Sequence, residues 1–162
     1  MKNLKISLVL FALVLSPMSA FAATPWTGTP AAAVVDKSSP SGAWSDNTKL
    51  TFDATGSTGT ILARMNVVST TNSTTPGWTT MEIRGYDSSA AQDVQVRLFR
   101  ASSGSVSNIA QCDTSDSALA QTVTCGLAST VDFSTNNYWI EIRVTRTSTS
   151  GTAPFLQSVR IY

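Results

Sequence analysis

The sequence predicts an all-β fold: an antiparallel β-sandwich, Ig-like or jelly-roll-like, of about seven to nine strands with one disulfide. Two observations predict this class. Short segments alternate hydrophobic and polar residues with a period of two, and after the first 22 residues no segment has the 3.6-residue period of an amphipathic helix. These segments are rich in Thr, Ser and Val and are separated by frequent turn signals, as expected for short antiparallel strands.

Residues 1–22 have the features of a cleavable secretory signal peptide. Lys2 and Lys5 precede an apolar run from Ile6 to Leu15, and Ala20-Phe21-Ala22 provides small residues at the spacing A-x-A. The apolar run is too short to span a bilayer, which takes roughly 20 residues. We therefore expect cleavage after Ala22 and a secreted or periplasmic protein without a membrane span once the signal is removed.

The mature chain of about 140 residues has the size of one domain. We expect a partly irregular N-terminal segment over 23–47 and a single β-sandwich domain over 48–162. Nine Lys and Arg stand against ten Asp and Glu after residue 22, spread along the chain. Nucleic acid and anionic membrane surfaces are therefore not expected as partners.

The strands are expected in a series of alternating segments. Ala31 to Asp36 predicts a short first strand, and Ser102-Ser103-Gly104 predicts a hairpin turn between two later ones. The remaining internal strands are expected at Lys49 to Phe52, Thr60 to Val68, Trp78 to Tyr86, Gln92 to Arg100, Val106 to Gln111 and Leu119 to Thr124.

The two C-terminal segments show the clearest alternation. In Asn137 to Arg146, an apolar set alternates strictly with a mostly polar set, so one face of the strand is expected in the core. In Phe155 to Tyr162, Phe155 shares its parity with Val159 and Ile161, which predicts that all three close the same core. The pair is expected to form a β-hairpin or two neighbouring strands of the sandwich.

Cys112 and Cys125 are expected to form a structural disulfide, because an exported chain meets oxidising conditions. A tight hairpin would pair Cys112 near Ala118, so the bridge is expected to close the base of a wider loop, with a stabilisation of about 3 kcal/mol. Asp113 and Asp116 in this loop have calcium-type oxygens. An Asp- and Ser-rich segment is more often an ordinary turn, so no metal site is predicted.

The chain contains no histidine, which removes the commonest general base and the commonest zinc or copper ligand. Glu82 and Glu141 are the candidate catalytic carboxylates, each near a tryptophan, and two carboxylates about 5 to 10 Å apart would be a glycosidase layout. Cross-strand ion pairs with arginines on a solvated sheet face explain the same pattern better. We therefore expect no enzyme and no cofactor.

The better functional lead is a set of aromatic residues on the polar parity of the strands. Trp78, Tyr86 and Trp139, with Glu82 and Glu141 beside them, are expected to share an outer sheet face. Exposed flat rings stack on sugar rings or bind a partner protein. This predicts a non-catalytic module that binds glycan or protein; the alternative is that the rings are half-buried beneath the N-terminal segment or a loop.

The strand Tyr138-Trp139-Ile140-Glu141-Ile142-Arg143-Val144 and the ending Val159-Arg160-Ile161-Tyr162, with an export signal and a cysteine pair, resemble those of small exported bacterial all-β proteins. The resemblance covers the mature chain from Val34 onward. It implies no activity and transfers no functional residues.

Two other functions fit the C-terminal alternation. The final strand resembles that of fimbrial subunits, which assemble by strand addition, so a structural or self-assembling surface subunit is the main alternative. The cysteines lie late in the chain, unlike the early pair expected of chaperone-dependent pilins. A terminal aromatic such as Tyr162 is also typical of outer-membrane barrels, which need about eight strands of nine or more residues, and only about four segments are that long.

Overall fold

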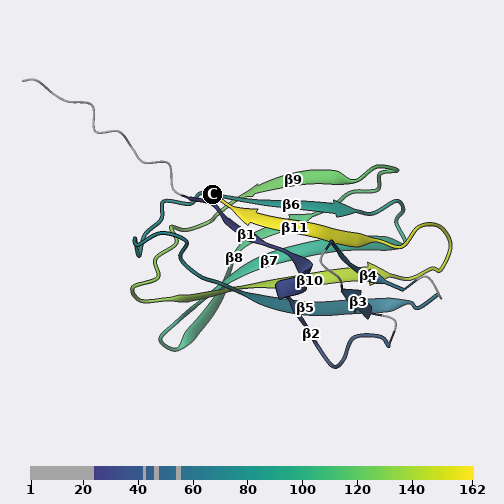
Figure 1. Ribbon diagram of the computed structural model, residues 1–162, viewed down its shortest axis with the longest axis horizontal. Helices are drawn as coiled ribbons and strands as arrows, with labels where there is room; N and C mark the ends of the chain where they lie inside the picture. The colour runs from purple at the N-terminus through teal and green to yellow at the C-terminus, as the bar shows by residue number, and fades with distance from the viewer. Residues whose placement is uncertain (1–23, 42, 46–47, 54–55) are drawn as a thin grey trace, which may run out of the picture.

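The computed structural model describes residues 24–41, 43–45, 48–53 and 56–162 (Figure 1). Over these ranges the chain forms two antiparallel sheets that enclose one hydrophobic core, which confirms the predicted β-sandwich. The expected signal peptide, residues 1–22, lies outside the described residues. No helix within the described part of the chain has the length and hydrophobicity needed to cross a bilayer.

The strands divide into a six-stranded and a five-stranded sheet. The six-stranded sheet contains β1 (Trp26–Gly28), β3 (Ala43–Ser45), β4 (Leu50–Phe52), β6 (Thr80–Tyr86), β9 (Gln121–Gly126) and β11 (Phe155–Ile161). The five-stranded sheet contains β2 (Val34–Val35), β5 (Gly59–Val67), β7 (Gln92–Ser102), β8 (Ser105–Asp113) and β10 (Asn137–Arg146). A 3-10 turn, η1 (Pro30–Ala32), joins β1 to β2.

The strand order is that of a jelly roll, one of the two predicted topologies. The six-stranded sheet has the order β3-β4-β11-β6-β9 with β1 also beside β11, and the five-stranded sheet has the order β2-β5-β10-β7-β8. From β4 to β11 the chain changes sheet at every connection except the β7–β8 hairpin. This pattern gives the two four-stranded groups β4-β11-β6-β9 and β5-β10-β7-β8 of a double-sheet jelly roll.

The core is built from one parity of each long strand. In β10, Ile140, Ile142 and Val144 are completely buried, as the alternation predicts. The turn at Gly104 has a φ of +80°, which glycine adopts without steric cost, and it joins β7 to β8 in the predicted hairpin. The short strands β1 and β3 were not predicted, because they lie in a segment rich in Pro, Thr, Ser, Ala and Gly, a composition typical of loops.

The predicted hairpin between the two C-terminal segments is wrong. β10 pairs with β5 and β7 in one sheet, whereas β11 pairs with β1, β4 and β6 in the other. The connection therefore crosses from sheet to sheet, and both strands bury their apolar parity in the core between the sheets. Arg146 holds this crossing, because it donates from Nε to the carbonyl of Ser148 at 3.0 Å and from Nη2 to that of Thr149 at 2.9 Å.

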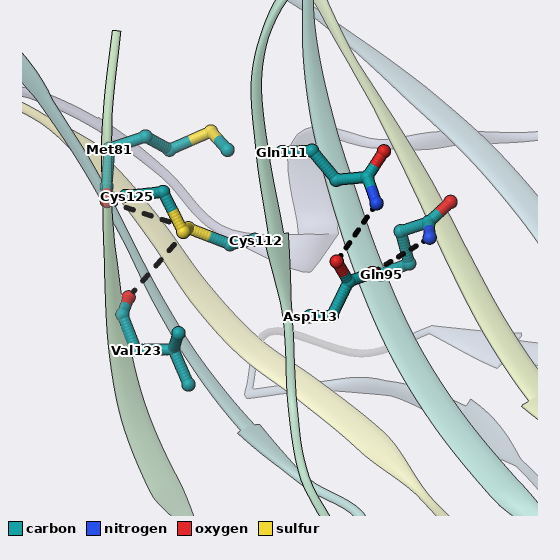
Figure 2. Close-up of a disulfide and its surroundings, with 7 residues drawn as sticks. All are labelled: Met81, Gln95, Gln111, Cys112, Asp113, Val123 and Cys125. Carbon is teal, nitrogen blue, oxygen red and sulfur yellow. Dashed lines mark hydrogen bonds between the residues drawn. A yellow bond between two sulfur atoms is a disulfide. The ribbon is translucent and has the colours of Figure 1, made fainter.

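The predicted disulfide between Cys112 and Cys125 is confirmed, with Cα atoms 5.7 Å apart. Cys112 lies on β8 and Cys125 on β9, which are edge strands of different sheets, so the bridge ties the two sheets together along one side (Figure 2). The Cys112 sulfur also contacts the carbonyl oxygens of Met81 and Val123, at 3.6 and 4.0 Å. The bridge therefore links the two sheets at the edge formed by β8 and β9 and also closes the loop of residues 113–124.

Candidate functional site

The predicted ligand residues do not share one face, so that part of the prediction is wrong. Glu82 and Tyr86 lie on β6 of the six-stranded sheet, and Trp139 and Glu141 lie on β10 of the five-stranded sheet. The buried side chains of both strands point into the shared core. The remaining side chains of the two strands therefore lie on opposite outer faces of the sandwich. Parity within a strand does not reveal the sheet to which the strand belongs, which is why sequence reasoning combined the two faces.

Trp78 belongs to the core and not to either outer face. Its side chain is 1 % exposed and packs edge-to-face on Phe133, with ring centroids 5.9 Å apart. The indole Nε1 donates a hydrogen bond to the carbonyl oxygen of Thr24 at 3.1 Å, so the N-terminal segment contacts it. Trp78 precedes the first residue of β6, Thr80, by two positions, and strand parity therefore does not apply to it.

On the five-stranded sheet the outer face brings Trp139 together with Phe99 of β7. The two residues are register partners, and their rings are nearly parallel, with centroids 5.3 Å apart and planes at 10°. Carbon atoms in contact lie about 3.5 to 4 Å apart, so nearly parallel rings at 5.3 Å are offset and each leaves part of its face uncovered. Both residues are half-buried, and we call this pair the Trp139–Phe99 platform.

Two asparagines flank the platform along the same row of the sheet. Asn66 of β5 is the register partner of Trp139, and Asn108 of β8 is the partner of Phe99. Both asparagines are exposed. Their amides provide a donor and an acceptor on either side of the aromatic rings.

The next row of this face is charged. Glu141 lies between Arg64 of β5 and Arg97 of β7 in the strand register. Its Oε2 is 3.4 Å from Arg64 Nη2, and its Oε1 is 2.9 Å from Nη2 and 3.0 Å from Nε of Arg143. The predicted cross-strand ion pairing is thus confirmed for Glu141, which is only 7 % exposed beneath its two arginines.

A hollow of about 390 Å³ lies over the platform and the charged row. Its lining consists of Arg64, Asn66, Phe99, Trp139 and Glu141. It therefore combines two aromatic rings with amide, guanidinium and carboxylate groups at one surface. Phe99 was not a predicted site residue, although its position on the polar parity of β7 was a signal that could have identified it.

The outer face of the six-stranded sheet carries a second aromatic pair. Tyr86 stacks on Phe155 of β11, with centroids 5.3 Å apart and planes at 13°, and Lys49 Nζ lies 5.6 Å from the centre of the Phe155 ring. Farther along this face, the Tyr162 hydroxyl donates to Glu82 Oε2 at 3.5 Å. A hollow of about 440 Å³ adjoins Phe155.

Phe155 was expected in the core, and this expectation is wrong. The pairing of β11 with β6 shifts register between Leu156 and Ser158, which marks an irregularity in the strand. On the C-terminal side of this irregularity, Val159 and Ile161 are buried. On its N-terminal side, Leu156 is buried and Phe155 is partly exposed. A one-residue slip reverses the face on which every following side chain lies, and nothing in the sequence marks this one.

The candidate catalytic carboxylates do not form a pair. Glu82 and Glu141 lie on opposite outer faces of the sandwich, whereas a glycosidase pair needs about 5 to 10 Å between carboxyl groups on one side. In the described residues no group of three or more His, Cys, Asp or Glu side chains gathers as a metal site would require. Asp113 instead accepts hydrogen bonds from the amides of Gln95 and Gln111, at 2.7 and 2.9 Å (Figure 2).

Burial raises the pKa values of two other carboxyl groups. Burial raises the pKa of Asp87, whose Oδ2 accepts a hydrogen bond from the Thr114 hydroxyl at 3.1 Å. Burial also raises the pKa of Asp93, and the nearby charges of Asp113 and Asp87 act in the same direction. Neither group lines the hollow over the platform.

No protein-family model matches this sequence, and no curated protein matches it. Similar solved structures include one described as "Structural basis for the promiscuous specificity of the carbohydrate-binding modules from the beta-sandwich super family", at a TM-score of 0.45 and 14 % identity over 88 % of this chain. The chain spans 58 % of that structure's length. Another is TmCBM61 in complex with β-1,4-galactotriose, at a TM-score of 0.42 and 12 % identity, covering 87 % of this chain and 89 % of that one. Likeness at this level does not extend either protein's ligand to this chain.

Proposed function

We propose that this protein is a non-catalytic module that binds glycan at the Trp139–Phe99 platform. The observation that carries the proposal is the offset, half-buried aromatic pair that lines a hollow together with amide and charged groups. The apolar face of a sugar ring stacks on an aromatic face, while its hydroxyl groups need hydrogen-bond donors and acceptors around the rim. Asn66 and the Glu141 ion pairs provide such groups within the same hollow.

The fixed geometry of the charged row supports binding. Glu141 is held by Arg64 and by two nitrogens of Arg143, so its carboxylate is already ordered before a ligand arrives. Ordering these side chains in advance reduces the entropy cost of binding. The absence of histidine and the separation of Glu82 from Glu141 favour binding without chemistry. The expected export signal, with the disulfide, favours a role in the periplasm or outside the cell.

The alternative role, self-assembly by strand addition, rested on the alternation of the final strand. β11 is an internal strand that pairs with β6 on one side and with β1 and β4 on the other. Its apolar parity is therefore explained by the core of its own domain. No further observation favours strand addition, and glycan binding remains the proposal.

A glycan array probed with the mature protein tests the proposal. The informative variants are Trp139→Ala and Phe99→Ala, and the matched control is Tyr86→Ala, which removes one ring of the other stacked pair on the opposite face. We expect at least a tenfold weaker affinity for the first two variants, which corresponds to about 1.4 kcal/mol, and unchanged binding for the control. Absence of glycan binding by the unmodified protein, or equal binding by Trp139→Ala, would overturn the proposal.

A further inference from the structure

Arg97 is the arginine of the charged row that has no partner. It faces Glu141 in the strand register, yet the carboxylate is bound by Arg64 and Arg143 instead. Within the described ranges Arg97 makes no ion pair and no side-chain hydrogen bond, and its Nε is buried without a partner. Its two terminal nitrogens are accessible to solvent and make no hydrogen bond to the described residues, so they are available as donors.

The neighbouring carboxylates have other partners and leave the Arg97 guanidinium available for an anion. Arg64, Arg97 and Arg143 lie around Glu141 in the two rows next to the platform, and Arg64 and Arg143 are already paired with it. Arg64 also lies near Asp36, whose pKa is lowered chiefly by hydrogen bonds from the side chain and backbone of Ser38 and, to a smaller extent, by the charge of Arg64. Of the other acidic groups of this face, Asp113 lies in the row next to that of Arg97, where it accepts two amide hydrogen bonds, and Asp93 lies one row farther from the platform. Within the described residues, Arg97 is therefore the arginine of these rows whose guanidinium has no carboxylate bound to it.

Arg97 is also placed to act together with the aromatic rings. It precedes Phe99 by two residues on β7, so both side chains project from the same face in adjacent rows. A sugar ring stacked on the platform would therefore have a guanidinium beside it. Guanidinium groups bind carboxylate and sulfate oxygens through paired N–H donors.

We propose that the glycan bound at the platform is acidic, bearing a carboxylate or a sulfate ester, and that Arg97 binds this anionic group. The inference rests on the proposed function of the platform and specifies its ligand class. It predicts that affinity depends on the charge of the glycan and decreases with ionic strength, because the anion contact lies at a solvated surface.

The test compares polysaccharides that differ only in charge. One pair is polygalacturonate and its methyl ester, which removes the carboxylate, and the other is dextran sulfate and dextran. Affinities are measured for the mature protein and for the Arg97→Gln, Arg97→Lys and Trp139→Ala variants, with thermal melting as a check of folding. The two pairs distinguish a carboxylate ligand from a sulfate ligand.

We expect the unmodified protein to bind the acidic member of at least one pair tenfold or more tightly than the neutral member. Arg97→Gln should reduce this preference to threefold or less without weakening the neutral glycan, Arg97→Lys should restore part of it, and Trp139→Ala should weaken both members. Equal binding of charged and neutral forms, or a preference that persists in Arg97→Gln, would overturn the inference while leaving the platform as a glycan site. Binding of dextran sulfate that is unaffected by Trp139→Ala would show charge attraction away from the platform and would also overturn it. If the unmodified protein binds none of these polysaccharides and no glycan on the array, the proposed function itself fails.

Discussion

Replacing Arg146 tests how the chain crosses from one sheet to the other. This side chain is the last of β10, is 4 % exposed and has no carboxylate partner among the described residues. It donates to the carbonyl oxygens of Ser148, Thr149 and Gly151, at 3.0, 2.9 and 3.4 Å. Its charge is therefore stabilised by the backbone of the loop that it orders.

The expected cost of Arg146→Met can be worked from these contacts. A hydrogen bond from a charged donor contributes about 1.5 to 3 kcal/mol, and two of the three bonds are short, so the gross loss is about 3 to 6 kcal/mol. Two effects offset part of this loss of stability. The loop is largely exposed, so water can replace the lost donors, and the substitution removes a buried charge whose Nη1 has no partner. Methionine keeps most of the packing of the aliphatic stem. We expect a net destabilisation of about 2 to 4 kcal/mol.

Urea unfolding of Arg146→Met, followed by tryptophan fluorescence, measures this loss. The matched control is Arg84→Met, because Arg84 is exposed on β6 and makes no hydrogen bond or ion pair within the described ranges; it should change stability by less than about 0.5 kcal/mol. Arg146→Lys should be intermediate, because one ammonium group replaces only some of the donors. If Arg146→Met is as stable as the control, the guanidinium does not hold the crossing and the reasoning is refuted.

Three further predictions concern the core and its closure. Trp78→Ala should lose about 3 to 5 kcal/mol of unfolding free energy, as a fully buried ring does, and a loss below about 1 kcal/mol would show that the ring is not in the core. A Cys112→Ser, Cys125→Ser double variant should lose about 3 kcal/mol in urea unfolding, and unchanged stability would mean that the bridge constrains little. Burial raises the native pKa of Asp87 above its ordinary value of 3.8, so the stability linked to its protonated form is fully present below pH 3.8 and is lost as pH rises through the native pKa. Asp87→Asn should therefore gain stability relative to the unmodified protein between pH 3.5 and pH 7, and an equal difference at both pH values would contradict this linkage.

Several features of the fold were predictable from residue pattern alone. The strict alternation around Ile140 and Ile142 identified the buried side of β10, because a strand turns successive side chains to opposite faces. The Ser102-Ser103-Gly104 turn and the Cys112–Cys125 bridge were also predictable, since turn chemistry and an expected oxidising compartment act at short range in the sequence.

The candidate site was predictable only in part. Trp139 and Glu141 were identified from their parity, but Phe99 was not selected and Tyr86 was placed on the wrong side of the sandwich. Each sheet has its own core side, so strands from either sheet show the same alternation. Assembling a site across strands requires the pairing of β10 with β5 and β7, and this pairing depends on contacts between residues far apart in the chain.

The sequence by itself determined the class of fold, the inward parity of the long strands and the disulfide, because these follow from the period of a strand and from local chemistry. The tertiary structure alone decided which sheet each strand joins, the burial of Trp78 and the irregularity that turns Phe155 outward. The physical reason is that register and sheet membership are set by long-range packing, in which a slip of one residue exchanges the core face for the solvent face.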